Sequence, residues 1–424
     1  MTEPLIGSGG VLDHRHLCEE AIASHGNSSP LSGSVLSRLR KELGPELAAF
    51  VVTQQSLQSK ATKKLGPQED PSRIWWVTDR ALQQATPWQA AAVKAKWFGR
   101  KPTLDLCCGI GGDAISLASR GPVVAVDSDP LVAELAAMNL NVDTVDAQIS
   151  KPSSLALSDS PSVRVVCNDV TELAIDPDWL VHIDPDRRPG SKRASRPDHY
   201  QPDWSFVSKL FTSQAGVVVK LAPAAEPELS DCPPTHRCWI SVAGSVREQS
   251  LLSGETLTFS ALIPQQRSAI VASSDGSFES FAPQKDSHDG AIDSVATPLG
   301  WLVDPDPAVR AAGLSVSFGF AFGLCPLGRP SGFFTSDAPP DVGRLAQVAK
   351  VIWAGSCDDR KLRRELRSRN VYPDVIKVRG TDHRPETLRK KYRKCGDTPV
   401  QLWIGRGKDR VYAALAERRP AASL

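Results

Sequence analysis

The chain has 424 residues, 41% of them hydrophobic, and a formal net charge of only +2, a composition typical of a globular protein of two to four domains. No run approaches the roughly 18 apolar residues that a membrane span needs, and the first residues lack the basic-then-apolar pattern of a signal peptide. The nine cysteines include no CxxC pair, which argues against a disulfide framework and against a metal site. We therefore expect a cytoplasmic protein.

The charge is unevenly distributed along the chain. Residues 344–424 contain 21 Lys and Arg against 9 Asp and Glu, a net charge of +12, so the remaining residues carry a net charge of −10. A basic segment of this kind indicates a polyanionic partner. The alternative is a basic surface that only contacts solvent.

The first hundred residues predict an N-terminal helical module over residues 1–99, of which 1–30 are Ser- and Gly-rich and expected to be poorly ordered. Between residues 36 and 65 apolar side chains recur at steps of three and four, which predicts an amphipathic helix broken near Gly44-Pro45. Four tryptophans follow between residues 74 and 99. We expect them in the core, between helix and sheet, with a base-stacking surface as the alternative.

Five apolar segments then predict a parallel β-sheet, each with polar residues at its carboxyl end. They lie at residues 104–106, 123–127, 163–167, 180–183 and 216–220. Continuous apolar strands are typical of a parallel sheet buried on both faces, whose ligands bind beyond the carboxyl ends of the strands. Two more strands are expected at 238–242 and 257–263, which gives an α/β domain over residues 100–265.

The strand at residues 104–106 leads into a glycine-rich turn. Gly109, Gly111 and Gly112 remove Cβ atoms, so a ligand can lie against the backbone, and a helix follows. Asp127 ends the second strand, where a carboxylate can accept both hydroxyls of a ribose. The spacing Gly109-x-Gly111-x-x-Ala114 also satisfies a dinucleotide fingerprint, so a nicotinamide cofactor is an alternative at this point.

The whole succession resembles the class I S-adenosylmethionine-dependent methyltransferases. The resemblance implies a doubly wound, Rossmann-like sheet with S-adenosylmethionine as cofactor. The segment from Asp105 to Gly112 would hold the methionine part, Asp127 the ribose and Asp169 the adenine amine. A nicotinamide enzyme would leave Asp169 unexplained. The implied cofactor-binding residues are Asp105, Cys107, Gly109, Gly111, Gly112, Asp113, Asp127, Ser128, Asn168 and Asp169.

The loop after the fourth strand faces the methyl acceptor in this family, which implies catalytic roles for Asp184, Pro185 and Asp186. Asp184 would accept a proton or a hydrogen bond from the nucleophile, whereas Asp186 could instead form a structural ion pair with an arginine. Amine methyltransferases commonly carry a second proline and an aromatic ring at this position. Here both are missing, so the acceptor can be an amine, a ring atom or a hydroxyl.

Basic residues follow this loop and alternate with aromatic ones. Such a pattern suits an unstacked nucleotide, and the alternative is a solvated basic loop whose aromatic ends are buried. The candidate RNA contacts here are Arg187, Arg188, Lys192 and Arg193.

Beyond a polar boundary at 273–290, a strand and a capped helix are expected over 301–314. A strand at 375–379, a helix at 385–394 and strands at 400–404 and 410–414 then predict a small α+β domain. The order resembles bacterial methyltransferases that end in a ferredoxin-like unit, here 290–342, and a THUMP-like domain, here 343–424. The segments that carry this resemblance are 76–86, 105–114, 182–188, 301–313 and 377–391.

Because related THUMP domains bind the backbone of structured RNA, the resemblance implies RNA as substrate. The expected contacts in this domain are Lys377, Arg379, Arg389, Lys390 and Arg393. The predicted function is therefore an S-adenosylmethionine-dependent methyltransferase acting on a base or ribose of rRNA or tRNA. The alternatives are a small-molecule or protein methyltransferase on the same fold and a non-catalytic RNA-binding protein with a degenerate core.

Overall fold

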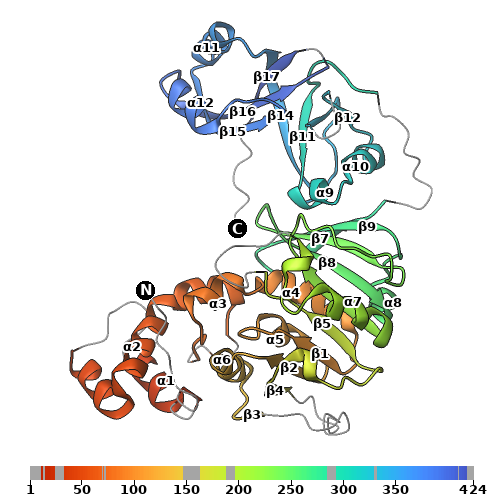
Figure 1. Ribbon diagram of the computed structural model, residues 1–424. Helices are drawn as coiled ribbons and strands as arrows, with labels where there is room; N and C mark the ends of the chain where they lie inside the picture. Colours follow the sequence, from red (N-terminus) through yellow and green to blue (C-terminus); the bar gives the residue numbers. More distant parts are fainter. Residues whose placement is uncertain are drawn as a thin grey trace. The chain divides into compact units, whose positions relative to one another are not determined.

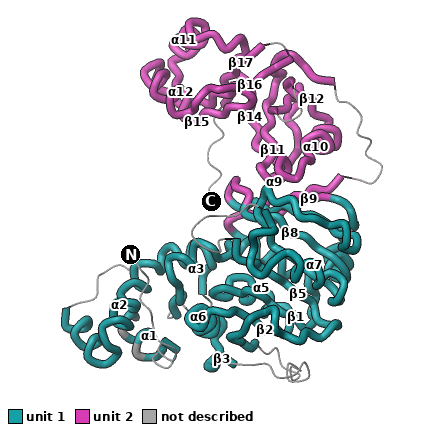
Figure 2. Tube along the Cα trace, viewed as in Figure 1, with its two compact units in different colours: residues 1–242, 247–266, 275–277 teal, residues 243–246, 267–274, 278–424 magenta. Residues whose placement is uncertain are grey.

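The computed structural model describes residues 11–12, 15–23, 33–68, 70, 73–146, 163–187, 196–283, 293–328, 332–408 and 410–417. The chain forms two compact units (Figure 2). The first comprises residues 1–242, 247–266 and 275–277, and the second comprises residues 243–246, 267–274 and 278–424. Within the described ranges, no helix is both long and apolar enough to cross a membrane.

Helices dominate the first hundred residues of the first unit (Figure 1). They are α1 (Arg15–Ala23), α2 (Gly33–Leu65), α3 (Asp79–Gln84), α4 (Trp88–Ala95) and the 3-10 turn η2 (Lys96–Phe98). The predicted break in α2 is confirmed, because Gly44 has a φ of 80° and Pro45 follows it. Trp75, Trp76 and Trp97 are buried in the core, which rules out base stacking on these three rings.

The main sheet supplies the scaffold of the first unit. The strands of this sheet between residues 103 and 254 are β1 (Thr103–Leu106), β2 (Val123–Asp127), β3 (Val145–Asp146), β4 (Val163–Cys167), β5 (Leu180–Ile183), β6 (Gly216–Leu221), β7 (His236–Val242) and β8 (Ser245–Gly254). They lie in the order β7-β8-β6-β5-β1-β2-β4-β3. β1 pairs in parallel with both β2 and β5, whereas β8 runs antiparallel to β6. The five predicted parallel strands and the mixed α/β architecture are thus confirmed.

Short helices connect these strands. They are α5 (Gly112–Ala118), α6 (Pro130–Leu140), α7 (Trp204–Ser213) and α8 (Glu255–Ser260), with 3-10 turns η4 (Val170–Glu172) and η5 (Pro197–His199). The strand expected at 257–263 is wrong, because this segment starts inside α8. Its apolar residues divide between a buried Leu257 and an exposed Phe259. The strand between β7 and β6 is β8, whose buried Glu248, Gln249 and Ser250 give it a polar sequence.

The second unit contains the antiparallel pair β9 (Arg267–Ala272) and β10 (Phe278–Phe281) and a seven-stranded sheet in the order β12-β13-β11-β14-β17-β16-β15. Its strands are β11 (Trp301–Pro305), β12 (Cys325–Pro326), β13 (Phe334–Ser336), β14 (Ala346–Ser356), β15 (Val371–Arg379), β16 (Thr398–Arg406) and β17 (Val411–Ala416). Its helices are α9 (Pro307–Ala311), α10 (Ser315–Ala321), α11 (Asp359–Ser368) and α12 (Pro385–Tyr392).

The predicted elements of this unit are largely present. The strand and capped helix near residue 301 are confirmed, since Asp306 accepts a 2.8 Å hydrogen bond from the backbone N–H of Ala308 at the start of α9. The alternation of strands and helix after residue 375 is also confirmed. β14 and α11 were not predicted. The predicted division at residue 342 falls between β13 and β14.

Candidate active site

The register of the parallel strands gathers functional residues at one edge of the sheet. Leu106 of β1 lies opposite Val126 of β2 and Ile183 of β5, and Ile183 lies opposite Val219 of β6. The next residue of each strand therefore falls in a common row at the carboxyl edge. That row contains Cys107, Asp127, Asp184 and Lys220.

The glycine loop is joined to the second strand of this row. The backbone N–H of Gly109 donates to Asp127 Oδ2 at 2.9 Å, and the N–H of Asp129 donates to Asp127 Oδ1 at 3.1 Å. Gly109 has a φ of 56°, and no atom lies within 4 Å of the place that a Cβ would occupy there. The loop therefore offers open space next to a fixed carboxylate, which fits a cofactor with a ribose.

The electrostatics of the loop are acidic. Burial raises the pKa of the Cys107 thiol well above its usual value, and the charges of Asp127 and Asp184 raise it further. Burial also raises the pKa of Asp127, against the effect of its two backbone hydrogen bonds. An anionic surround of this kind favours a cationic ligand over an anionic one.

The remaining cofactor candidates divide into a rim and an interior. Ser128 and Asp169 are exposed, and Asp169 accepts a 2.8 Å hydrogen bond from the N–H of Thr171 in η4. The backbone of Asn168 is held by the carbonyl of Asp127 at 3.0 Å. These three residues lie directly after β2 and β4, at the carboxyl ends of the two strands.

Asp105 and Asp113, in contrast, are buried and bonded within the protein. Asp105 is the register partner of His182, so the two side chains share one face of the sheet, and His182 Nδ1 lies 2.6 Å from Asp105 Oδ1. Asp113 Oδ2 accepts a 2.6 Å hydrogen bond from the hydroxyl of Thr86. Their carboxylates therefore hold the loop in place from inside, rather than lining its open side.

Two buried lysines connect these acids to Asp184. Lys94 Nζ lies 2.8 Å from Asp113 and 3.0 Å from Glu248, and 3.2 Å from His182 Nε2. Burial alone would lower the pKa of Lys94, but the charges of Asp113 and Glu248 outweigh it and raise the pKa. The group is thus a lysinium ion enclosed by carboxylates.

The second lysine ends the chain of contacts. Lys220 Nζ donates to Thr86 Oγ1 at 2.8 Å and forms an ion pair with Asp184. The side chain of Lys220 is 3% exposed and that of Asp184 is 24% exposed. Asp184 is therefore the member of this network that can reach a bound substrate, and its carboxylate is oriented from behind by a cation.

Sequence analysis did not identify Lys94, Lys220, Thr86, His182 or Glu248 as functional. The sequence did contain an indication of their importance, because ionisable residues interrupt apolar strands or an Ala-rich helix at several of these positions. Such residues are almost never fully buried unless they are paired. Their partners come from segments far away in the sequence, so the pairing itself was not visible.

The loop after Asp184 is held by its neighbours. Pro185 is buried. Asp186 pairs through its backbone with Gln201, and its carboxylate accepts a 3.1 Å hydrogen bond from Gln84 and lies 3.8 Å from Arg80. Asp186 thus pairs with an arginine, but this one is Arg80 of α3 and comes from outside the basic segment that follows Asp186 in the sequence. This arrangement suits a residue that positions the loop.

The basic candidates next to this loop are only partly described. Nη1 of Arg187 is buried and has no hydrogen-bond partner among the described residues. Arg188, Lys192 and Arg193 lie outside the described residues.

The basic candidates of the second unit fall into two groups. Lys377 and Arg379 contact Asp304, at 2.7 Å and 3.3 Å, with side chains 14% and 31% exposed, so they are partly buried next to a carboxylate. Arg389, Lys390 and Arg393 are exposed at α12, and Arg393 lies over the ring of Tyr372.

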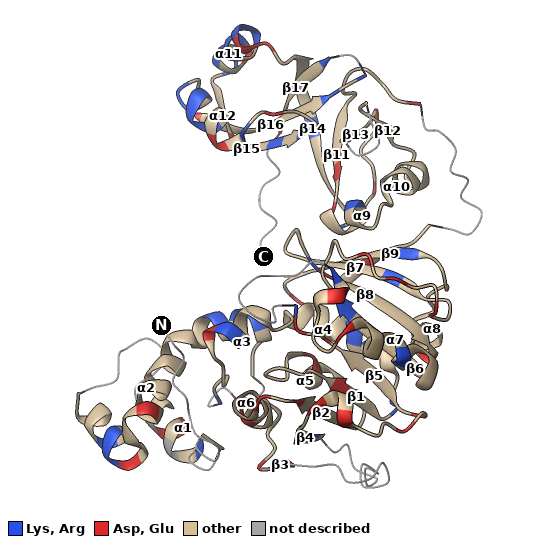
Figure 3. Cartoon of the chain, in the orientation of Figure 1, with Lys and Arg blue, Asp and Glu red and all other residues tan. Residues whose placement is uncertain are grey.

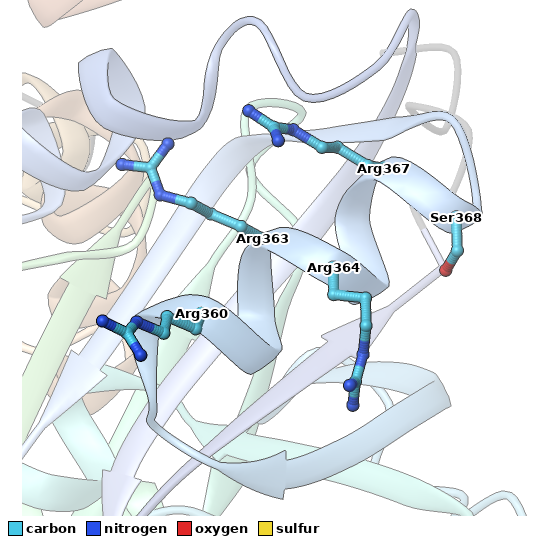
Figure 4. Close-up of a pocket in the computed structure, with 5 residues that line it drawn as sticks. All are labelled: Arg360, Arg363, Arg364, Arg367 and Ser368. Carbon is cyan, nitrogen blue, oxygen red and sulfur yellow. The ribbon is translucent and has the colours of Figure 1, made fainter.

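A further basic surface that the sequence analysis missed is α11. Its side chains Arg360, Arg363, Arg364 and Arg367 line an open pocket together with Ser368 (Figure 4). Figure 3 shows Lys and Arg along both α11 and α12. Exposed cations therefore gather on these two helices of the second unit.

Comparison with known proteins supports the fold. No protein-family model matches the chain. An uncharacterized S-adenosylmethionine-dependent methyltransferase of Mycobacterium tuberculosis, present in strains CDC 1551 and H37Rv, is 29% identical over 371 residues, 85% of this chain and 93% of the relative. A crystal structure from Porphyromonas gingivalis W83, provisionally named a methyltransferase, matches with a TM-score of 0.69 at 17% identity, over 95% of this chain and 98% of that one.

The fold is that of a methyltransferase. In this fold the glycine loop, Asp127 and Asp184 all lie at the carboxyl edge of the parallel strands.

Proposed function

We propose that this protein methylates RNA, with S-adenosylmethionine as the methyl donor. The enzyme class and the cofactor agree with the names of its relatives, and the RNA substrate rests on the charge distribution of the second unit. The single observation that carries the catalytic part is the partly exposed Asp184, joined to Lys220 in the row that also holds Asp127.

The residues of this row would have different roles in the reaction. The cofactor supplies an electrophilic methyl group on a sulfonium centre. Asp127 and the open backbone at Gly109 would hold its ribose and methionine parts, in keeping with the acidic surround of the loop. Asp184 would accept a hydrogen bond or a proton from the nucleophile, while Lys220 fixes the direction of its carboxylate. Such alignment is the main contribution a protein makes to a transfer of this type.

RNA is favoured over a small molecule or a protein by the arginine-rich helix α11 and the exposed cations of α12. Arg360, Arg364 and Arg367 are exposed and belong to one open pocket. Planar guanidinium groups bind phosphate in bidentate geometry. Several guanidinium groups on one helix suit the phosphodiester backbone of a nucleic acid better than they suit a ligand with a single charged group.

The direct test is methylation of nucleic acid. Purified protein with isotopically labelled S-adenosylmethionine should label nucleosides in total RNA from cells that lack the gene, and mass spectrometry would identify the product. Labelled protein or labelled small molecules with unlabelled RNA would reject the RNA substrate while keeping the enzyme class. No transfer to any fraction, with intact cofactor binding, would favour a non-catalytic RNA-binding protein.

A first prediction concerns the cofactor. Asp127→Ala should weaken S-adenosylmethionine binding by about 1–3 kcal/mol, since it leaves ribose hydroxyls poorly paired and frees the Gly109 N–H. Isothermal titration calorimetry measures the change. Asp129→Ala is the matched control, because the exposed Asp129 carboxylate caps α6 and its N–H, the donor to Asp127, is retained. Tight binding of a nicotinamide cofactor by the wild type, without response to S-adenosylmethionine, would reject the cofactor assignment.

A second prediction concerns the basic helix. Changing Arg360, Arg364 and Arg367 together to Gln should weaken binding of structured RNA and lower the slope of log affinity against log salt by roughly 2–3, because each phosphate contact contributes about 0.9. Filter binding at several salt concentrations gives the slope.

The control for this experiment removes three exposed charges elsewhere. Lys41, Lys60 and Lys63 are exposed along α2, so their joint change to Gln matches the loss of charge. An equal loss of slope in both triple variants would mean that net charge, and not α11, determines RNA binding.

A further inference from the structure

Three cations surround one carboxylate in the second unit. Asp304 of β11 lies 2.7 Å from Lys377 Nζ, 3.3 Å from Arg379 Nη2 and 3.7 Å from Arg310 Nη1. Lys377 and Arg379 come from β15 and Arg310 comes from α9. A strand that is distant in the sequence and the helix that follows β11 thus converge on a single acid whose side chain is 9% exposed.

Positive charge exceeds negative charge in this cluster. Asp306 is the other carboxylate that acts on Arg310, and it caps α9 through the N–H of Ala308. Among the described residues, three cations therefore face Asp304 and Asp306, and the Asp306 carboxylate also caps α9. Burial, together with the charges of Arg379 and Arg310, lowers the pKa of Lys377 against the opposing effect of Asp304. The cluster holds its cations close together at an electrostatic cost.

Several donors in the cluster remain without an acceptor. Nε of Arg310, Nε of Arg379 and the hydroxyl of Tyr412 are buried and make no hydrogen bond with the described residues. The ring of Tyr412 is almost fully buried, and burial, followed by the charge of Asp304, raises its pKa. A buried donor without a partner is destabilising, so an additional acceptor would be stabilising here.

Aromatic rings hold the cations in position. Lys377 Nζ lies 4.6 Å from the centre of the Trp403 ring, and the guanidinium of Arg379 lies 5.5 Å from that of Phe333. The two rings pack edge to face at 4.8 Å and are fully buried. The cationic groups are therefore directed before any ligand arrives, which lowers the entropy that binding would cost.

We propose that Arg310, Lys377 and Arg379, which all contact Asp304, form an anion site that binds a phosphoryl group. An arginine fork and an ammonium match the oxygens of phosphate in geometry and charge, and the free donors supply the hydrogen bonds. The phosphoryl group can belong to a free phosphorylated compound or to an RNA chain. All residues of this site lie in the second unit, so they are distinct from the row that contains Asp127 and Asp184.

The test uses the full-length protein without S-adenosylmethionine. Calorimetric titrations use three probes: inorganic pyrophosphate, a 5′-phosphorylated trinucleotide of RNA and its 5′-hydroxyl counterpart. Together they distinguish a free phosphorylated compound from an RNA chain as the source of the phosphoryl group. Saturable binding of pyrophosphate and of the 5′-phosphorylated trinucleotide alone would indicate a terminal or free phosphate. Equal binding of both trinucleotides would indicate an internal phosphodiester. Absence of saturable binding for all three probes would overturn the proposal.

Variants test the residues themselves. Arg379→Gln should weaken binding of the bound probe at least tenfold, whereas Lys350→Gln, which removes an exposed cation of β14, should leave it unchanged. Asp304→Asn should strengthen binding several-fold, because it removes the competing carboxylate. A cluster that serves only as a structural ion pair predicts equal binding in the wild type and in Arg379→Gln, and that result would reject the site. If circular dichroism shows that Asp304→Asn is unfolded, the Arg379 and Lys350 variants decide the question.

Discussion

Asp184→Asn is expected to lower the rate of methyl transfer by about 10²–10⁴-fold, the range typical of losing a general base. Cofactor affinity should stay within a few-fold, because in the proposed reaction Asp184 contacts the methyl acceptor and Asp127 contacts the cofactor. Single-turnover assays with labelled cofactor measure the rate of the chemical step, and calorimetry measures the affinity. Asp184→Ala should show the same separation, with a loss at least as large.

Asp186→Asn is the matched control for this prediction. Its carboxylate is taken up by Gln84 and Arg80, so the change should alter stability more than the chemical step. Normal turnover in a purified, folded Asp184→Asn protein would show that the nucleophile is activated elsewhere. A loss of cofactor binding in step with the loss of rate would instead move Asp184 to the cofactor side.

The largest expected effect on stability comes from Lys94→Met. Removing this ammonium leaves Asp113 and Glu248 buried without their cation, a change that typically costs about 3–5 kcal/mol. Urea unfolding followed by circular dichroism gives the free energy. Lys96→Met, at an exposed position one residue beyond α4, replaces the same side chain and should change stability by less than about 0.5 kcal/mol.

The same variant has a predictable pH dependence. Burial opposes ionisation of Asp113, but the charges of Lys94 and His182 outweigh it and hold the pKa of Asp113 below its usual value. Stability from such a lowered pKa is present above the unfolded pKa of about 3.9 and is lost as the pH falls towards the folded value. The gap between wild type and Lys94→Met should therefore narrow below about pH 4. A gap that widens there would show that Asp113 is not the main partner of Lys94.

Sequence analysis predicted the elements whose conformation follows from their own residues, without contacts from distant parts of the chain. The strand at 123–127 is continuously apolar, and the turn at Gly109 needs a backbone that few residues other than glycine adopt. β8 was missed because its buried Glu248 is neutralised by Lys94, a residue more than 150 positions earlier in the sequence. α11 was missed because only Leu362 and Leu366 mark its buried face.

The candidate active site likewise contains residues that can be located from the sequence and residues that cannot. The positions of Asp127 and Asp184 follow from strand ends, which can be located in a sequence. The role of Lys220 depends on Thr86 and Asp184 meeting it in space, and that meeting requires the tertiary structure. For the same reason, Lys377 and Arg379 looked like exposed cations until Asp304 of a different strand was placed next to them.

Lys94 and Thr86 both precede β1, yet they fill the centre of the charge network beneath Asp184. The methyltransferase sheet of this protein is therefore not an interchangeable module. A fragment that begins at residue 100 would lack the cation shared by Asp113 and Glu248 and the hydroxyl that links Asp113 to Lys220. Recombination between relatives should succeed only when the segment containing α3 and α4 is inherited together with β5, β6 and β8, so that these parts of the chain have to evolve as one unit.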